Sequence, residues 1–325
     1  MFGGRYNMKE PLIGILMATY NGEKYISQQI DSILNQTYRN WQLLIHDDGS
    51  TDKTVEIVKS YVKKYPDKIL LIEDGIKCGG AKENFSHLIK IARANFKFDY
   101  IMFSDQDDVW FFDKIEKTLK KMHELENLYG KNKPLLVHTD LIVVDEKLNK
   151  ISDSFWKYQK INPLNNSLAC LILENTVTGC TMMINKTLLE QVRFIPKEAI
   201  IHDWWIALIC RLNKGEIGVL KEPTIFYRQH HFNDTGAKNY SLYAILKRII
   251  KNNIKIIYRR NRFFKKFLFQ TKALIEYSKN TKIHCPLLYE LEKVIDNPFK
   301  RRFFYLKKKM LCGSVLKKFI KFLAI

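Results

Sequence analysis

Two short segments place several carboxylates where they could act on one ligand: HDDGSTD (46–52) and SDQDD (104–108). In each segment, aspartates follow directly after an apolar run. Carboxylates that meet in one cleft repel each other and are costly without a cation. Mg²⁺ and Mn²⁺ prefer oxygen ligands, and proteins often hold them with few carboxylates plus substrate phosphates. SDQDD alone is typical of a solvated loop whose acids cap a helix, but the two segments together favour a site for a divalent cation and a diphosphate.

The elements that must position these carboxylates alternate along the first 129 residues. Apolar runs predict strands at 12–21, 41–48, 68–74 and 100–108, and apolar residues at helical spacing predict helices at 23–36, 51–66, 82–95 and 113–129. This alternation is typical of βαβ units around a parallel sheet. Such sheets bind ligands at the carboxyl ends of their strands. We therefore expect ATYN (18–21) and the two acidic segments to lie together at one sheet edge.

The remaining body is less regular. Strands are predicted at 135–146 and 216–231, and helices at 187–192 and 203–212. The chain has no GxGxxG and no GxxxxGK[ST] motif, which argues against the common dinucleotide-binding and nucleoside-triphosphatase sites.

Composition limits the class of protein. A chain of 325 residues that is 46% hydrophobic can bury one large domain or two smaller ones. Its six cysteines are scattered without a CxxC pair, so we expect a reduced, cytosolic chain with neither a disulfide framework nor a zinc site. The N-terminus lacks the apolar core of a signal peptide, and no apolar stretch is long enough to span a bilayer. The protein is expected to be soluble or to lie on a membrane without crossing it.

The net charge of +20 is concentrated near the C-terminus. Residues 238–325 carry 23 basic and four acidic side chains, whereas residues 1–237 carry 31 and 30. Basic residues alternate there with Phe, Ile, Leu and Tyr at helical spacing, which predicts a basic helical extension that binds an anionic membrane surface. A helical subdomain packed on the body is the alternative. Aromatics among basic residues also suit single-stranded nucleic acid, but the carboxylates of the cleft would repel phosphates, so no nucleic acid is expected.

The motifs, taken as an ordered set, carry a resemblance to a known family. MATYNGEKYISQQIDSILNQTYRNWQLLIHDDGSTDKT, followed by FSDQDDVW, resembles the family 2 glycosyltransferases, which are inverting, nucleotide-sugar-dependent enzymes of the GT-A fold. The resemblance is strong over 11–125 and weaker to about residue 236. SDQDDVW with the later HDWWIAL and YRQHHFN is most similar to rhamnosyltransferase-type enzymes of bacterial surface polysaccharide synthesis.

The resemblance implies an α/β fold with a Rossmann-like mixed, mostly parallel sheet flanked by helices. It further implies a nucleotide-sugar-binding half over 1–125, an acceptor-binding and catalytic-base half over 126–237, and the basic helical extension over 238–325. The expected reaction moves a sugar from a nucleotide-diphosphate donor to a saccharide or lipid-linked acceptor. The expected location is cytoplasmic, at the inner face of the cell membrane. A non-catalytic scaffold of the same fold and a sugar nucleotidyltransferase are the alternatives.

Roles carry over to the matching residues. The nucleotide-sugar-binding residues implied are Thr19, Tyr20, Asn21, Asp47, Asp48, Asp105, Arg228 and His230. Thr19 and Tyr20 would line the base pocket, and either Asp47 or Asp48 would accept a hydrogen bond from the base. Asp105 would lie near the ribose. Asp107 would bind the divalent cation, Mg²⁺ or Mn²⁺, that bridges the diphosphate.

The resemblance also implies a general base, Asp203 in HDWW, although His202 stands where the family often has Glu. Asp203 could instead be the N-cap of the helix that starts there. Trp204 and Trp205 are expected to form an apolar wall for the sugar or to pack in the core. Arg228 or His230, or less readily His231, would reach the diphosphate. The donor's base and sugar stay open, and dTDP-rhamnose is favoured by the resemblance alone.

Overall fold

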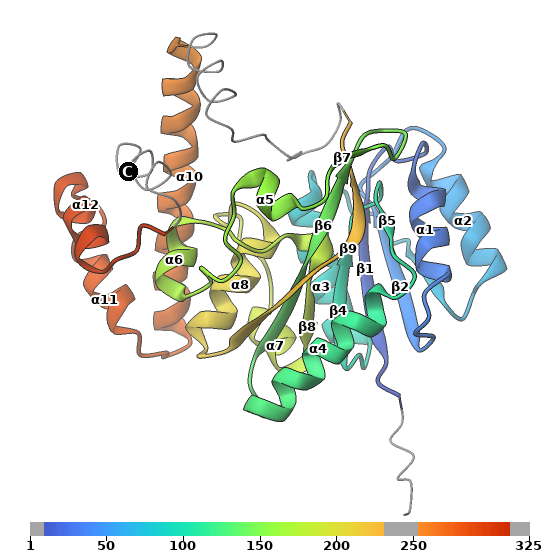
Figure 1. Ribbon diagram of the computed structural model, residues 1–325, viewed down its shortest axis with the longest axis horizontal. Helices are drawn as coiled ribbons and strands as arrows, with labels where there is room; N and C mark the ends of the chain where they lie inside the picture. The colour runs from blue at the N-terminus through green and yellow to red at the C-terminus, as the bar shows by residue number, and fades with distance from the viewer. Residues whose placement is uncertain (1–9, 231–252, 313–325) are drawn as a thin grey trace, which may run out of the picture.

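The computed structural model describes residues 10–230 and 253–312, with side chains described in the second range from residue 265 onward (Figure 1). One mixed sheet runs through the body, in the order β3-β2-β1-β4-β8-β6-β9-β5, with β7 added beside β6. Its strands are β1 Ile13–Thr19, β2 Trp41–Asp47, β3 Ile69–Ile72, β4 Tyr100–Ser104, β5 Val109–Trp110, β6 Leu135–Val144, β7 Lys150–Ser152, β8 Met183–Asn185 and β9 Glu216–Arg228. Strands from both predicted halves of the body therefore share one sheet.

Most of the sheet is parallel. β1 pairs in parallel with β2 and β4, and β2 pairs in parallel with β3. β8 runs antiparallel to both β4 and β6, while β6 and β9 are parallel and β5 is antiparallel to β9. The predicted α/β fold with a mixed, mostly parallel sheet is confirmed.

Helices cover both faces of the sheet, which makes three layers (Figure 1). The helices of the body are α1 Ile26–Leu34, α2 Thr54–Lys64, α3 Ala81–Asn95, α4 Lys114–Tyr129, α5 Phe155–Gln159, α6 Leu168–Leu173, the 3₁₀ helix η1 Gly179–Thr181, α7 Lys186–Val192 and α8 His202–Leu212. Strand residues alternate between the faces: Leu16 packs with α3 and α8, whereas Ile15 and Met17 pack with α1 and α4. This period of two is what buries an apolar run on both sides.

The C-terminal extension is helical over its described part, with α10 Asn253–Asn280, α11 Pro286–Glu292 and α12 Pro298–Lys307. Figure 1 shows these helices on the side of the body away from α1 and α2. Phe267, Leu274 and Phe304 are buried in the same apolar cluster as α3 and α8. Gln270 accepts a hydrogen bond from the backbone of Ile200, and Tyr277 donates one to Gln191. The extension therefore packs on the body.

The sequence-based expectation that the cysteines form no disulfide is wrong for one pair. Cys170 in α6 is bonded to Cys312, which follows α12, with their Cα atoms 5.6 Å apart. The two residues are 142 positions apart, so local spacing gave no sign of the bond. The packing of the extension on the body brings them together.

Two further outcomes concern the chain as a whole. Among the described residues, no helix combines the length and apolar character needed to cross a bilayer. Phe263, Phe264 and Phe319, which belong to the aromatic residues expected at the membrane surface, lie outside the residues whose side chains are described, as does His231, which was expected near the diphosphate.

Candidate active site

The carboxyl ends of β1, β2 and β4 meet at one edge of the sheet, as the sequence predicted. Thr19 at the end of β1 pairs with Asp47 at the end of β2, and Met17 pairs with Ser104 at the end of β4. Because these strands are parallel and in this register, the acidic segments after β2 and β4 flank the end of β1.

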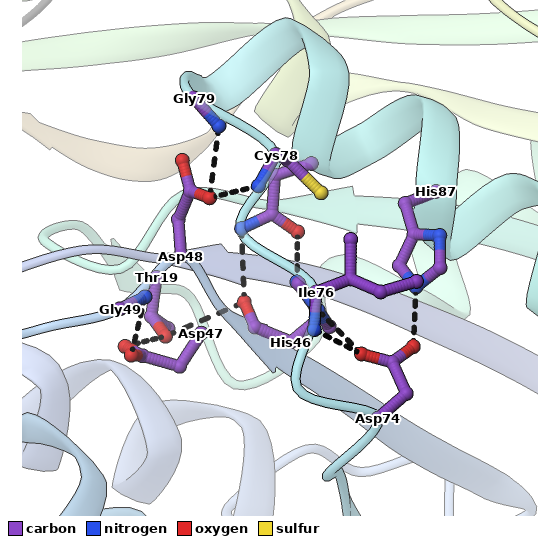
Figure 2. A network of polar contacts seen from close by, with 11 residues as sticks. Thr19, His46, Asp47, Asp48, Gly49, Asp74, Ile76, Cys78, Gly79 and His87 are labelled. Atoms are coloured by element: carbon purple, nitrogen blue, oxygen red, sulfur yellow. Dashed lines mark hydrogen bonds and ion pairs between the residues drawn. The ribbon is translucent and has the colours of Figure 1, made fainter.

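The two adjacent aspartates after β2 face different partners (Figure 2). Asp47 accepts hydrogen bonds through Oδ1 from the backbone amides of Gly49 (3.0 Å) and Ser50 (2.7 Å), and through Oδ2 from the hydroxyls of Thr19 (2.8 Å) and Ser50 (2.6 Å). Asp47 thus fixes its own turn to the end of β1.

Asp48 points toward the loop between β3 and α3. Its Oδ1 accepts from the amides of Cys78 and Gly79, and its Oδ2 accepts from the amide of Gly80 at 2.7 Å. The hydrogen bonds donated to each aspartate offset part of its negative charge, so the two neighbouring carboxylates are tolerated. Asp48 Oδ2 accepts one of these bonds, whereas each oxygen of Asp47 already accepts two.

Tyr20 and Asn21 continue from β1 at the rim of this edge. The Tyr20 side chain is 55% exposed, while its backbone is held by both ends of the Gln106 amide at 2.9 Å. Asn21 accepts a hydrogen bond from the Thr51 amide at 2.8 Å. A Cβ on Gly22 would lie 2.3 Å from Gln106 Oε1, so a larger residue there would displace the Gln106 amide that joins the ends of β1 and β4.

Asp107 lies on the loop after β4 and meets the end of β9. Its Oδ2 is 2.7 Å from Nε2 of His230, and its carbonyl oxygen accepts from Nε of Arg228 at 2.8 Å. The guanidinium of Arg228 also donates to Glu146 O (2.6 Å) and Gln28 Oε1 (2.6 Å) and stacks on Tyr25. Arg228 is buried and joins distant segments of the chain, whereas the His230 side chain contacts the predicted metal ligand directly.

The acidic loop contains a third carboxylate, that of Asp108, which is fully buried. Oδ1 accepts from the backbone of Arg228 at 3.1 Å, and Oδ2 has no conventional hydrogen-bond partner among the described residues. Burial and the neighbouring charges of Asp107 and Asp105 raise the pKa of Asp108 well above its usual range. Ligand atoms of Asp105, Asp108 and Cys180 all lie within 4.8 Å of one another.

These residues suit a hard divalent cation. Clustered carboxylates offer the oxygen ligands that Mg²⁺ and Mn²⁺ prefer. Lys114 is also buried nearby, with its ammonium 4.7 Å from the Trp110 ring centroid and no hydrogen-bond acceptor among the described residues. Burial lowers the pKa of Lys114 to about 8.

Asp203 lies in the first turn of α8 and is 5% exposed. Its Oδ1 accepts from Asn175 Nδ2 at 2.9 Å, and its Oδ2 accepts from the amide of Gly179 at 2.9 Å. Burial raises the pKa of Asp203 to about 7 despite these hydrogen bonds. Ile201 is the N-cap of α8, so the alternative that Asp203 caps this helix is wrong. A carboxyl group with this pKa can exchange a proton near neutral pH.

The neighbours of Asp203 are core residues. Trp204 and Trp205 are both buried in the apolar cluster, and Trp204 Nε1 donates to Leu171 O at 2.5 Å. The structure thus gives the two indoles the packing role that the sequence left open. His202 packs against the rings of Phe85 (4.1 Å between centroids) and Phe103 (5.6 Å), and burial lowers its pKa to about 3.

The helix η1 joins Asp203 to the acidic loop. Gly179 donates its amide to Asp203, and the next residue, Cys180, lies beside Asp105 and Asp108. A Cβ on Gly179 would lie 2.6 Å from His202 Nε2, so the close approach requires glycine. Sequence reasoning missed Gly179 and Cys180 of η1, because a three-residue 3₁₀ helix leaves no periodic signal.

The chain matches the model of the family described as glycosyl transferase family 2 over residues 14–193. It is 32% identical over 241 residues to the dTDP-rhamnosyl transferase RfbG of Shigella flexneri, a match that covers 72% of this chain and 78% of the relative. It is 31% identical to the UDP-Glc:alpha-D-GlcNAc-diphosphoundecaprenol beta-1,3-glucosyltransferase WfgD of Escherichia coli, over 58% of this chain and 65% of that protein.

Solved structures share the fold at low sequence identity. Staphylococcus aureus TarS 1–349 in complex with UDP-GlcNAc matches with a TM-score of 0.52 at 16% identity, over 91% of each chain. The mannosyltransferase PcManGT of Pyrobaculum calidifontis, in complex with GDP-Man and Mn²⁺, matches with a TM-score of 0.51 at 15% identity, over 96% of this chain and 79% of that one. The fold is therefore of the GT-A type, and the chain belongs to glycosyl transferase family 2.

Proposed function

We propose that this protein is an inverting, metal-dependent glycosyltransferase that moves rhamnose from dTDP-rhamnose to a saccharide or lipid-linked saccharide in cell-surface polysaccharide synthesis. The observation that carries the proposal is η1, in which Gly179 binds the buried Asp203 and the next residue, Cys180, lies beside the acidic loop. A transferase needs both groups at the reacting carbon, one for the departing diphosphate and one for the incoming hydroxyl. The name of the Shigella relative supports the choice of sugar.

The donor base would meet the end of β1 and β2. Asp48 is the better acceptor for an N3–H group than Asp47, because Asp48 Oδ2 accepts one hydrogen bond whereas both oxygens of Asp47 accept two. The Thr19 hydroxyl donates a hydrogen bond to Asp47, and the exposed Tyr20 ring is available to cover the base. Asn21 holds the adjoining turn. Residues 1–125 would then serve the donor, and 126–237 the acceptor and the base.

The diphosphate would bind over the loop after β4, with Asp105 near the ribose. Asp107 would hold a Mg²⁺ or Mn²⁺ ion, whose positive charge stabilises the departing diphosphate. His230, whose Nε2 lies 2.7 Å from Asp107 Oδ2, would keep this carboxylate oriented and contact the diphosphate. Arg228 would act on the diphosphate indirectly, by positioning the acidic loop. Its guanidinium donates to Asp107 O, Glu146 O and Gln28 Oε1.

Asp203 would take the proton of the acceptor hydroxyl as that oxygen attacks the anomeric carbon. Its pKa of about 7 suits this task, since the base must be ionised at working pH and still be able to accept a proton. Attack from the face opposite the diphosphate inverts the anomeric centre.

The acceptor would be reached at the inner face of the cell membrane. On α12, Phe299, Phe303 and Leu306 are 78%, 69% and 50% exposed and recur at i, i+4 and i+7, which places them on one helix face. Exposed Lys300 and Lys307 flank this face. A helix with exposed aromatics beside lysines suits the surface of an anionic bilayer.

The proposal is tested by incubating the purified full chain with dTDP-rhamnose, UDP-glucose or GDP-mannose, each with and without Mn²⁺, and following thermal unfolding. We expect dTDP-rhamnose to protect most, and only with the metal. Product analysis by NMR should then show an inverted anomeric centre. Protection by no nucleotide sugar would favour the non-catalytic scaffold, and retention of configuration would overturn the assignment of Asp203.

A further inference from the structure

A second group of metal-ligating side chains lies beside the loop between β3 and α3, whose backbone amides bind the Asp48 carboxylate (Figure 2). His46 precedes Asp47 in β2, Asp74 follows β3, and His87 belongs to α3. Nε2 of His46 is 3.3 Å from Asp74 Oδ1, and Nε2 of His87 is 2.5 Å from Asp74 Oδ2. The three ligand atoms lie within 4.8 Å of one another.

Hydrogen bonding fixes which nitrogen of His46 carries a proton. The amide group of Asn84 donates from Nδ2 to His46 O at 3.0 Å, so its Oδ1 is the atom that faces His46 Nδ1 at 2.9 Å. Nδ1 must therefore be the donor. In the neutral ring Nε2 then carries a lone pair, and that lone pair faces a carboxylate oxygen of Asp74, which is itself an acceptor.

Two facing acceptors need something positive between them, either a second proton on His46 or a cation. The His46 side chain is 1% exposed, and its Nδ1 already donates to the amide oxygen of Asn84. This is the arrangement that metal-binding histidines adopt, with one ring nitrogen donating to a carbonyl-type oxygen and the other free to bind the metal.

We propose that His46, Asp74 and His87 form a site for a transition-metal dication, with Zn²⁺ the best match, separate from the oxygen-rich site for Mg²⁺ or Mn²⁺. Two imidazoles and one carboxylate are a zinc ligand set, and a tetrahedral ion with bonds of about 2.0–2.1 Å sets its ligand atoms about 3.3 Å apart. His46 and Asp74 already have that separation. Asp74 is 30% exposed, so a water can complete the coordination from the solvent side.

Such a site would restrain the loop between β3 and α3, which binds the Asp48 carboxylate. Asp74 begins this loop, the amides of Cys78, Gly79 and Gly80 in its middle bind the Asp48 carboxylate, and His87 lies in the helix that follows. An ion shared by β2, the loop and α3 would restrain the loop at both ends. This consequence rests on the proposed function, since it predicts tighter donor binding when the site is filled, whereas the metal site itself does not.

The test uses the full chain without a histidine tag and Co²⁺ as an optical probe for Zn²⁺. We expect one Co²⁺ ion to bind with the visible absorption of four-coordinate nitrogen and oxygen ligation, and Zn²⁺ to displace it. His87→Ala and Asp74→Asn should each weaken Zn²⁺ binding at least tenfold. His123→Ala, which removes an exposed histidine in α4, is the matched control and should leave binding unchanged.

Two outcomes would overturn the site: no visible Co²⁺ band in the wild-type chain, or the same band in His87→Ala. Nitrogen NMR of the histidines gives an independent measurement. If His46 is protonated on both nitrogens at neutral pH and its signals do not change with Zn²⁺, the group is an imidazolium–carboxylate pair. Asp107→Ala should keep the Co²⁺ band, so loss of the proposed function and loss of this site are distinguishable.

Discussion

At the scale of single residues, the environment of Asp203 decides what it can do. The carboxyl group is buried, so its neutral form is favoured and its pKa is raised to about 7. The folded chain therefore holds a proton that the unfolded chain would release near pH 4. This contribution to stability is fully present below the ordinary aspartate pKa and is lost as the pH rises through about 7, over the same interval in which the base becomes active.

Asp203→Asn should keep donor binding and lower turnover by about 10²–10⁴-fold, because it keeps the side chain's size and removes the proton acceptor. In the wild type, kcat/KM should rise with pH through an apparent pKa near 7, and the variant's residual rate should lose that dependence. Initial rates across pH 5.5–9, with donor affinity measured separately, check both expectations. Wild-type turnover in Asp203→Asn would assign the base elsewhere.

Asp107→Ala should abolish Mn²⁺-dependent turnover and lower the temperature of thermal unfolding, because the Asp107 side chain is only 14% exposed and its Oδ2 lies 2.7 Å from Nε2 of His230. Asp153→Ala is the control, because it removes an exposed carboxylate on a loop far along the chain from the acidic segments. Measurements in EDTA and in a Mn²⁺ titration complete the test. Wild-type activity that survives EDTA and is unchanged in Asp107→Ala would refute the metal role.

At the scale of elements, the sequence predicted what its periodicity could encode. The strands β1 to β4 and the helices α1 to α4 were predicted because each is a long apolar run or a long amphipathic repeat. β5, β7, β8 and η1 were missed, since elements of two or three residues have no period to detect. The same limit hid Gly179 and Cys180 from the predicted site, although Asp105 and Asp107 were recognised from the end of a clear strand.

Gly179→Ala tests whether η1 positions the base. The added Cβ would lie 2.6 Å from His202 Nε2 and 3.6 Å from Asp203 Oδ2, so the turn or α8 must shift. We expect kcat to fall by about 10²-fold with donor affinity retained, since a displacement of about 1 Å is enough for such a loss.

The double variant with His202→Ala provides the control, because it removes the ring that the new methyl group meets. We expect it to recover part of the lost rate relative to Gly179→Ala alone. If Gly179→Ala turns over normally, η1 is not a positioning element.

At the scale of the whole molecule, the basic extension packs on the body and is also proposed to bind a membrane. Its inner surface completes the apolar core with Phe267, Leu274 and Phe304, and the bond between Cys170 and Cys312 fastens it to α6. Its outer surface carries the exposed stripe of α12. The sequence predicted helices and charge but could not separate these surfaces, because apolar residues at helical spacing look alike whether they face the body or a membrane.

Replacing Phe299, Phe303 and Leu306 together by Ser should weaken binding to anionic vesicles and leave thermal unfolding nearly unchanged, because all three side chains are mostly exposed. Wild-type binding should weaken with added salt, since each basic residue near such a surface contributes about 1 kcal/mol. Vesicle co-sedimentation over a salt series measures both effects. Tyr289→Ser, an exposed aromatic on α11, is the control. A triple variant that binds like the wild type would exclude α12 as the contact.

The continuous sheet has a kinetic consequence for the proposed enzyme. β4 carries the acidic loop and is hydrogen-bonded to β8, and η1, which holds Asp203, lies one residue before β8. A hinge that separated the acidic loop from the base would have to break this ladder. The acidic loop and Asp203 are thus held in place by one sheet before substrates bind. Substrates must then enter and leave by movements of the loops at the rim, the carboxyl edge of this sheet. For the proposed enzyme we therefore expect the rate of product release to depend on movements of that rim rather than on the closure of two lobes.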